Sequence, residues 1–274
     1  MTMTGIDRRA CPAVVFLCAL IFAGSAKASL MFDGVATGKG AGIGTSNIVL
    51  TIQHNPTETG CVGWSGSADV IGSGACPGGL SPAITGGDEK TGSSQTQTRL
   101  VSATGVQGGS TLAVVLNVSE PAGGPFTAEN ISLTIYSPTG VVLFNSGNMF
   151  QAGTPPGGGV TINSSFQGQG NLGFAFILDS AQAAAASVWL CTNSAAIGCA
   201  GLANASNANN RIGIAAVLTN VAGSNETFSV ADFSNVTVTT PEPWTFATAA
   251  AGLALLGLFR RFRARRSTSP RSAD

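Results

Sequence analysis

The hydrophobic positions between residues 47 and 238 occur in short runs that are typical of β-strands. The runs are rich in β-branched and aromatic residues, and Gly, Asn, Ser and Pro separate them. They predict strands at residues 47–53, 111–119, 131–136, 141–145, 172–178, 211–219 and 227–238. Such a series indicates an all-β fold, which we expect to be an antiparallel, jelly-roll-like β-sandwich with long loops rich in Gly, Ser and Asn.

The segment from Ile131 to Asn145 predicts a β-hairpin. Aliphatic residues alternate with Ser, Thr and Tyr at residues 131–136, and residues 137–140 (SPTG) are the types found in a β-turn. Alternation places the aliphatic side chains on one face of the strand, where we expect a second sheet to bury them. The opposite face, with its Ser and Thr side chains, is expected to meet water.

Two further runs are apolar at nearly every position, and one segment favours a helix. Residues 112–118 and 173–178 lack polar alternation, which suits central strands covered on both faces. Residues 179–187 are rich in Ala, and Asp179 or Ser180 is a suitable N-cap. One or two helical turns are therefore expected there.

The remaining stretches are expected to be loops. Residues 34–44, 60–79, 153–159 and 193–210 are dominated by Gly, Ala, Ser and Asn and hold few large apolar side chains. The alternating glycines at residues 38–44 do not predict a phosphate site, because neither a strand-to-helix context nor the Lys and Ser/Thr of a P-loop accompanies them.

The N-terminal residues have the order of a secretory signal peptide. A pair of arginines precedes an apolar run at residues 13–24, and Ala26 and Ala28 are the small residues that signal peptidase inspects. The apolar run spans only about 18 Å as a helix, whereas a bilayer core is about 30 Å thick. We therefore expect a signal peptide at residues 1–28, cleaved between Ala28 and Ser29.

Export predicts that the cysteines of the mature chain form disulfide bonds. Cys61, Cys76, Cys191 and Cys199 remain after the signal peptide, and an oxidising compartment favours disulfides between them. Three pairings are possible, and we favour Cys61 with Cys76 and Cys191 with Cys199, because each pair brackets a loop with little packing of its own. A zinc site is disfavoured because the close cysteine pairs of such sites are missing, and we expect neither another metal nor a cofactor.

Near the C-terminus an uncharged apolar segment precedes a cluster of arginines. Residues 244–259 span about 24 Å as a helix, so we expect one transmembrane helix there. The anchor residues are Trp244, Leu253, Leu255, Leu256, Leu258 and Phe259, and the basic stop consists of Arg260, Arg261, Arg263, Arg265 and Arg266. Trp244 suits one interface of the bilayer, and the positive-inside rule places the arginines in the cytoplasm.

A proline-flanked glutamate stands directly before this segment. Pro241 and Pro243 each remove a backbone donor and favour extended geometry in the preceding residue, so Pro241-Glu242-Pro243 is a stiff, extended, acidic tripeptide. Pro243 is also suited to begin the helix that follows. A tripeptide of this shape at the outer membrane surface suits capture by a membrane enzyme.

Residues 240–266 closely resemble the PEP-CTERM sorting domain, the C-terminal signal that exosortases recognise in Gram-negative, exopolysaccharide-forming bacteria. The resemblance rests on the Pro-Glu-Pro motif, the apolar segment and the arginine cluster. It implies transient anchoring in the inner membrane, cleavage near Pro-Glu-Pro, and release or transfer to the cell surface or matrix. The polar tail at residues 267–274 departs from the family, whose domains usually stop soon after the arginines. Residues 29–239 are left as one β-sandwich domain.

The zero net charge of the whole chain conceals an acidic middle region. Residues 29–239 hold ten acidic and four basic side chains, and the other basic residues lie in the two terminal segments. Binding to nucleic-acid phosphates needs a clustered basic surface, so no nucleic-acid partner is expected.

An enzyme is poorly supported by these residues. His54 is the only histidine, and no Ser/His/Asp or metal-ligand cluster accompanies it, so we expect a loop histidine and no catalytic residues. The least favoured function is a glycan-acting hydrolase with paired carboxylates. Its candidate carboxylates are Asp69, Asp88, Glu89, Glu120, Glu129, Asp179, Glu226 and Asp232.

The sequence favours a structural, matrix-associated protein of an exopolysaccharide or biofilm layer. Its Ser, Thr and Asn side chains are suited to form many weak hydrogen bonds to glycan hydroxyls. The alternative is a carbohydrate-binding, adhesin-like module with Trp64 as a platform for a sugar, although a position capping the core is favoured for that side chain. A place in the core is also expected for Trp189.

Overall fold

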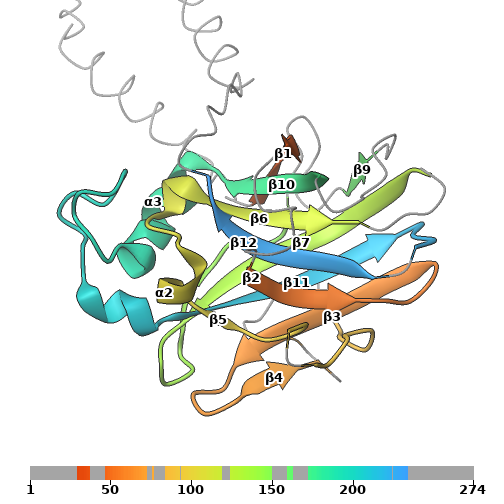
Figure 1. Ribbon diagram of the computed structural model, residues 1–274, viewed down its shortest axis with the longest axis horizontal. Coiled ribbons are helices and arrows are strands. Elements are labelled where there is room, and N and C mark those ends of the chain that lie inside the picture. Colours follow the sequence, from red (N-terminus) through yellow and green to blue (C-terminus); the bar gives the residue numbers. More distant parts are fainter. Residues whose placement is uncertain are drawn as a thin grey trace, which may run out of the picture.

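The computed structural model describes residues 30–37, 47–72, 76, 84–92, 94–118, 124–149, 159–162, 172–223 and 225–233. These residues form antiparallel β-sheets with few helices, which confirms the prediction of an all-β fold (Figure 1). The expected signal peptide, Pro-Glu-Pro motif, transmembrane segment and arginine cluster lie outside the described residues. Within the described ranges, no helix has the length and apolar character needed to cross a membrane.

One sheet has five strands in the order β1, β10, β6, β12 and β2. Their bounds are β1 (Leu30–Thr37), β10 (Leu172–Leu178), β6 (Leu112–Asn117), β12 (Glu226–Asp232) and β2 (Asn47–Ile52). β6 and β10 are internal strands, as their uninterrupted apolar runs predict. A separate apolar cluster, formed by Ala113, Val115, Ala175 and Phe233, lies apart from the main core and includes residues of both strands.

The other sheet has seven strands, in the order β4, β3, β11, β7 and β8, with β5 paired to β11 and β9 paired to β7. Their bounds are β4 (Asp69–Ile71), β3 (Thr57–Trp64), β11 (Arg211–Thr219), β7 (Phe126–Tyr136), β8 (Val142–Asn145), β5 (Arg99–Leu100) and β9 (Val160–Ile162). β11 pairs with β7 along its whole length, so these two strands form the centre of the sheet.

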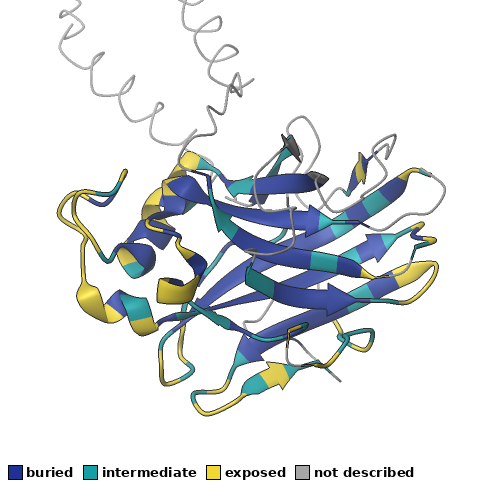
Figure 2. Cartoon of the chain, in the orientation of Figure 1, coloured by how far each residue is buried: buried dark blue, intermediate teal, exposed yellow. Residues whose placement is uncertain are grey.

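An apolar core fills the space between the two sheets. Most residues of the central strands are accordingly buried (Figure 2). Its fully buried aromatic side chains are Phe126, Phe176 and Phe228, from β7, β10 and β12. The aliphatic side chains of residues 131–135 on β7 also face this core, as the hairpin pattern predicts. Removing these side chains from water is the main force that holds the two sheets together.

The short helices are α2 (Val101–Thr104), the 3-10 helices η1 (Gly109–Thr111) and η2 (Ala205–Asn209), and α3 (Ser180–Leu190). Asp179 caps α3 as the sequence indicates, since its Oδ1 atom accepts hydrogen bonds from the backbone N–H groups of Ala181 and Gln182, both at 2.9 Å. α3 continues past its expected end at residue 187, where Leu190 is buried in the core and Trp189 packs against it.

The outer edge of β2 is covered by the segment that follows residue 84. The backbone N–H groups of Lys90 and Gln97 donate to the carbonyl oxygens of Thr51 and Val49 at 2.9 and 3.0 Å. The side chain of Arg99 adds a bond from its Nε atom to the carbonyl oxygen of Ile48 at 2.7 Å. Backbone carbonyl groups at this edge of the five-stranded sheet are therefore hydrogen-bonded to an irregular segment, so the edge is not open to a neighbouring chain.

The same segment bonds to the seven-stranded sheet through carboxylates. Asp88 Oδ2 accepts a hydrogen bond from the backbone N–H of Thr59 at 2.9 Å, and Glu89 Oε1 accepts one from that of Cys61 at 2.7 Å. Both donors belong to β3, so the two acidic side chains take the place of a neighbouring strand. Residues 88–92 and 94–99 thereby join the edges of the two sheets.

The predicted hairpin forms, but its polar face is not exposed. Ser137 N donates to the carbonyl oxygen of Val141 at 2.8 Å, which closes the turn between β7 and β8. Ser132 and Thr134, expected to meet water, are 0% and 3% exposed. The prediction for this face is therefore wrong, because strand alternation reports which side chains share a face and not what covers it.

Several expected loops contain strands. β3 and β4 lie largely within residues 60–79, and β1 extends into residues 34–44, both of which are expected loops. Pairing with β11 and β10 outweighs the low strand propensity of their glycines, since strand formation depends strongly on neighbours. The strand that includes residues 131–136 also begins earlier than expected, at Phe126.

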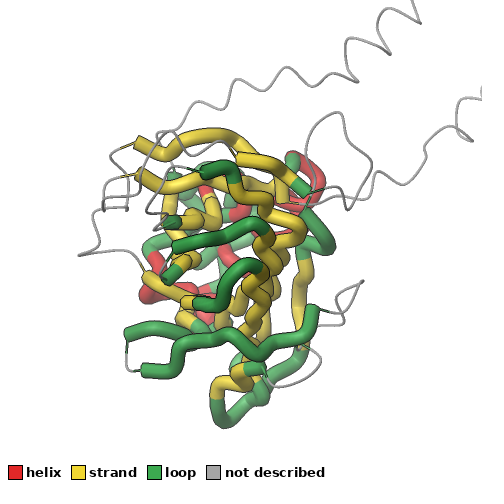
Figure 3. The backbone as a smooth tube through the Cα atoms, turned by 90° about the vertical axis from the view of Figure 1, so that its right-hand side faces the viewer, coloured by secondary structure: helices red, strands yellow, loops and turns green. Residues whose placement is uncertain are grey.

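The strands define two ends of the sandwich. At one end, which we call the exit end, Leu30 of β1 pairs with Leu178 of β10, and Asp232 of β12 pairs with Leu112 of β6. The helices and the β7–β8 turn also lie at this end, on the left of Figure 1. At the opposite end, which we call the far end, lie the turns that follow β2 and β11. Figure 3 views the molecule from the far end, with the helices behind the strands.

We predict that Gly109→Ala destabilises the protein, because a methyl group at this position would meet the backbone of Ala183 in α3. Overpacking of this kind lowers the free energy of unfolding by about 1–3 kcal/mol. Gly124→Ala is the matched control, since a methyl group there has no atom within 4 Å. Denaturant unfolding should give a lower midpoint for the Gly109 variant alone. Equal midpoints would contradict the close packing of α3 on η1.

Candidate functional site

Trp64 ends β3 at the exit end and lies half-buried outside the apolar core. The guanidinium carbon of Arg211 lies 3.8 Å from the centroid of its ring, in a cation–π contact. Its Nε1 atom donates a hydrogen bond to the carbonyl oxygen of Pro138 at 2.9 Å. Trp64 therefore fastens the end of β3 to the turn between β7 and β8, and the expectation that it caps the core is wrong.

Arg211, the first residue of β11, joins three neighbouring segments. Its Nη1 atom donates to Thr98 Oγ1 at 2.9 Å and lies 3.9 Å from Asp69 Oδ1. Asp69 Oδ1 also accepts a hydrogen bond from the backbone N–H of Thr98 at 3.1 Å. The Arg211 and Asp69 side chains are each about one quarter exposed, so solvent screens this ion pair and its main effect is to position Arg211 over Trp64.

This arrangement limits what Trp64 offers to a ligand. Sugars bind aromatic side chains by stacking on a ring face, and Arg211 already occupies one face of the indole. The indole N–H, the usual polar contact of a tryptophan platform, is bonded to Pro138. The geometry therefore favours a structural role for Trp64. Sequence reasoning identified Trp64 but missed Arg211, because their contact joins residues far apart in the chain.

Tyr136 lies beside this cluster, opposite Arg211 in the pairing of β7 with β11. Its side chain is 1% exposed. Burial raises the pKa of its phenol to about 12, against a smaller opposing effect of a hydrogen bond with Thr134. Tyr136 thus contributes a neutral, buried hydroxyl to the sheet.

The first disulfide covers the outer face of the seven-stranded sheet. Cys61 on β3 bonds to Cys76, the local pairing favoured by the sequence. Both half-cystines form an apolar cluster with Ile84 and Ala215. The disulfide therefore does more than close a loop, because it holds an apolar cover over the middle of β11.

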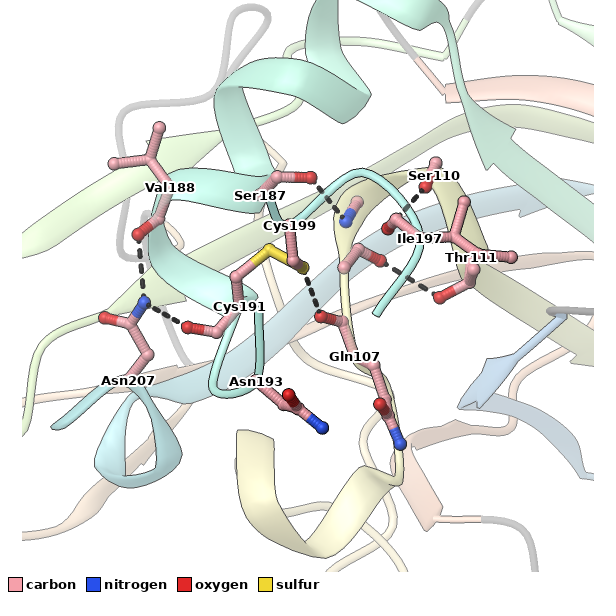
Figure 4. The surroundings of a disulfide bond; sticks show 12 residues. Gln107, Ser110, Thr111, Ser187, Val188, Cys191, Asn193, Ile197, Cys199 and Asn207 are labelled. Atoms are coloured by element: carbon pink, nitrogen blue, oxygen red, sulfur yellow. Dashed lines mark hydrogen bonds between the residues drawn. A yellow bond between two sulfur atoms is a disulfide. The ribbon is translucent and has the colours of Figure 1, made fainter. Parts of the chain in front are cut away.

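The second disulfide joins Cys191, at the end of α3, to Cys199 (Figure 4). Both cysteines are fully buried. Cys199 Sγ lies 2.8 Å from the carbonyl oxygen of Gln107, a sulfur–oxygen contact and not a hydrogen bond, since a disulfide sulfur carries no proton. Asn207 Nδ2 donates to the carbonyl oxygens of Val188 and Cys191 at 2.9 and 3.0 Å. These contacts fix the segment after α3 against the neighbouring helices.

The candidate carboxylates serve mainly as acceptors that hold segments together. Those that accept a hydrogen bond from a backbone or hydroxyl donor are Asp69, Asp88, Glu89, Glu129, Asp179 and Asp232. Glu226, at the start of β12, is fully buried and therefore lies out of reach of a polysaccharide. Glu120 lies outside the described residues.

Glu58 and His54 lie at the far end and show no arrangement typical of catalysis. Glu58 is fully buried, and its Oε1 atom accepts a hydrogen bond from the backbone N–H of His54 at 3.0 Å. The imidazole of His54 is exposed, with Nδ1 lying 3.1 Å from the carbonyl oxygen of Thr57. Among the residues that the structure describes, no group of three His, Cys, Asp or Glu side chains is placed to hold a metal ion.

Comparison with known proteins adds no relative: the chain has no significant match to a protein-family model, to a curated protein or to a solved structure.

The buried phenol predicts a delayed tyrosine titration. The folded pKa of about 12 lies above the ordinary value of about 10, so the stabilisation by neutral Tyr136 is complete below pH 10 and is lost as the pH rises through 12. Absorbance at 295 nm reports this group cleanly, because Tyr136 is the only tyrosine of the chain. We expect ionisation near pH 12 in the folded protein and near pH 10 in guanidinium chloride. A folded-state transition near pH 10 would show that the phenol is accessible.

Proposed function

We propose that this protein is an exported component of the bacterial cell envelope, which an exosortase sorts at Pro241-Glu242-Pro243 and which takes a structural place in an extracellular polysaccharide layer. The two disulfides support export, because such bonds persist in oxidising compartments. The sorting step rests on the sequence of residues 240–266, with the Pro-Glu-Pro motif, apolar segment and arginines in that order.

The observation that carries the proposal is that the first and last described residues lie at the same end of the sandwich. Leu30 follows the expected cleavage site after a single residue, and Phe233 precedes the sorting segment. Both lie at the exit end, next to η1 and α3: Leu30 pairs with the last residue of β10, and the backbone N–H of Phe233 donates to the carbonyl oxygen of Thr111 at 2.6 Å. A membrane anchor attached there would hold the domain by one end and direct its far end outward.

A structural role is consistent with the use of polar groups in this domain. Its carboxylates hold segments together, and its surface is poor in charge, so many weak hydrogen bonds to glycan hydroxyls are its available mode of contact. We also propose that the sandwich is jelly-roll-like, since adjacent strands such as β10 and β6 come from distant parts of the sequence.

The alternative is a carbohydrate-binding, adhesin-like module. The observation in its favour is the half-exposed position of Trp64 outside the core. We place it second, because Arg211 and Pro138 already contact the ring face and the indole N–H.

The sorting step predicts that Pro241→Ala/Glu242→Ala/Pro243→Ala abolishes C-terminal processing. In an exosortase-encoding host, a C-terminally tagged precursor should accumulate in the inner-membrane fraction, whereas the parent protein loses the tag. Glu120→Ala/Pro121→Ala is the matched control, since it removes another Glu-Pro pair far from the sorting segment. Normal processing of the triple variant would refute recognition at this motif.

The structural role predicts no saturable binding of the secreted domain to oligosaccharides on a glycan array. If saturable binding appears, Trp64→Ala and Trp64→Phe decide its origin, because the second variant keeps an aromatic face. Binding lost in the alanine variant and kept in the phenylalanine variant would establish the carbohydrate-binding alternative. Thermal unfolding of both variants shows whether each remains folded.

A further inference from the structure

The exposed large hydrophobic side chains of the described residues gather at the exit end. They are Val70, Val141, Val142, Val188, Ile197 and Leu202. Ile197 and Val141 are 62% and 59% exposed, although such side chains are usually buried in soluble domains. The turn at residues 53–57, which lies at the far end, reads Gln-His-Asn-Pro-Thr and offers no comparable side chain. Among the described residues, the exit end therefore carries exposed apolar side chains that this turn lacks.

These side chains come from separate elements that meet at this end. Val188 lies on α3, and Ile197 and Leu202 follow the helix. Val141 follows the turn after β7, and Val142 begins β8. Val70 pairs with Gly63, the neighbour of Trp64. An apolar character shared by unrelated elements indicates a property of the surface and not of one loop.

The segment that carries Ile197 is held in place. Ser110 Oγ donates to the carbonyl oxygen of Ile197 at 3.3 Å, and the disulfide between Cys191 and Cys199 brackets the residue (Figure 4). Cys199 N donates to the carbonyl oxygen of Ala196 at 3.1 Å. The exposure of Ile197 is thus imposed by a fixed local fold.

One part of the exit end is free of charged side chains, whereas Arg211 and Asp69, which also lie at this end, are paired with each other. Residues 180–210 contain no Asp, Glu, Lys, Arg or His. The acidic groups on either side are engaged, Asp179 with the first turn of α3 and Asp232 with Thr111 Oγ1 at 3.0 Å. A partner bound through ion pairs, including an anionic lipid surface, finds no basic side chain in residues 180–210.

The chain outside the described residues leads from this end to an apolar segment. Ten residues, 234–243, separate Phe233 from Trp244, and they reach at most about 36 Å when extended. If residues 244–259 lie in a bilayer, the exit end is held within this distance of its surface. Short tethers give effective concentrations in the millimolar range, so even weak apolar contacts are populated.

We propose that the exit end rests on the outward-facing leaflet of the inner membrane, with Val188, Ile197 and Leu202 in contact with zwitterionic phospholipid. The inference rests on the membrane anchor of the proposed function. It assigns these side chains the role of orienting the anchored precursor with its far end away from the membrane. Insertion of apolar side chains into the interface supplies the attraction, and the uncharged segment at residues 180–210 lowers the cost of approaching the lipid.

Two tryptophan reporters test the proposal in the full-length chain. Ile197→Trp reports the exit end, and Ala222→Trp is the matched control, since Ala222 is exposed in the connection after β11 at the far end. Each variant is reconstituted in vesicles of phosphatidylcholine and phosphatidylethanolamine, with and without brominated acyl chains. The native tryptophans give a common background, so the emission that each reporter adds is the measured quantity. Leu202→Trp serves as a second exit-end reporter if Ile197→Trp fails to fold.

We expect brominated lipid to remove most of the emission added by the Ile197 reporter and to leave that of the Ala222 reporter. Flotation with the vesicles is measured first, because a chain that does not float refutes the anchor and the inference together. A chain that floats with neither reporter quenched, or with both quenched equally, retains the anchor and refutes the inference. Self-association of the exit end would also refute it, and would appear as a concentration-dependent blue shift of the Ile197 reporter in detergent without bilayers.

Discussion

Side chains of β7 and β11 face those of β6 and β12 across one apolar layer, and the need to keep this layer dry places the other elements. Two sheets in contact leave open edges, where backbone groups and apolar side chains would meet water. Residues 88–92 and 94–99 close one such edge by bonding to β2 through their backbone and to β3 through Asp88 and Glu89. α3 covers the exit end, where Leu190 packs on the core.

The same requirement explains how this domain uses its few charges. Asp88 and Glu89 accept bonds from strand N–H groups, Asp179 caps a helix, and Asp69 positions Arg211 over Trp64. A carboxylate can accept backbone hydrogen bonds and so connect segments of irregular geometry. Pairing between strands, in contrast, requires regular spacing. The acidic balance of residues 29–239 therefore has a structural origin as well as an effect on solubility. It also leaves fewer carboxylates available for chemistry, which is why a structural role is favoured.

Local patterns were sufficient for part of the fold. The strands at residues 172–178 and 211–219, the turn at residues 137–140 and the Asp179 cap follow from residue types within a short window. The sequence did not reveal β3, whose glycines and cysteine resemble a loop until β11 lies beside it. Both disulfide pairings follow from the loops with little packing of their own that each cysteine pair brackets, whereas the stack of Arg211 on Trp64 joins distant residues that no local pattern relates. The buried Ser132 and Thr134 were missed for the same reason, since the covering of a strand face depends on tertiary contacts.

The position of β12 bears on how this domain would respond to force. β12 lies between β6 and β2 and is hydrogen-bonded to both, and its last residues lead to the C-terminal segment. Tension between an attachment at that segment and a matrix contact on the opposite side of the domain would run along the strand. The interstrand bonds lie across this direction, so they would share the load in shear rather than open one after another from an edge. An internal strand at the point of attachment therefore suits a domain that is under tension between two attachments.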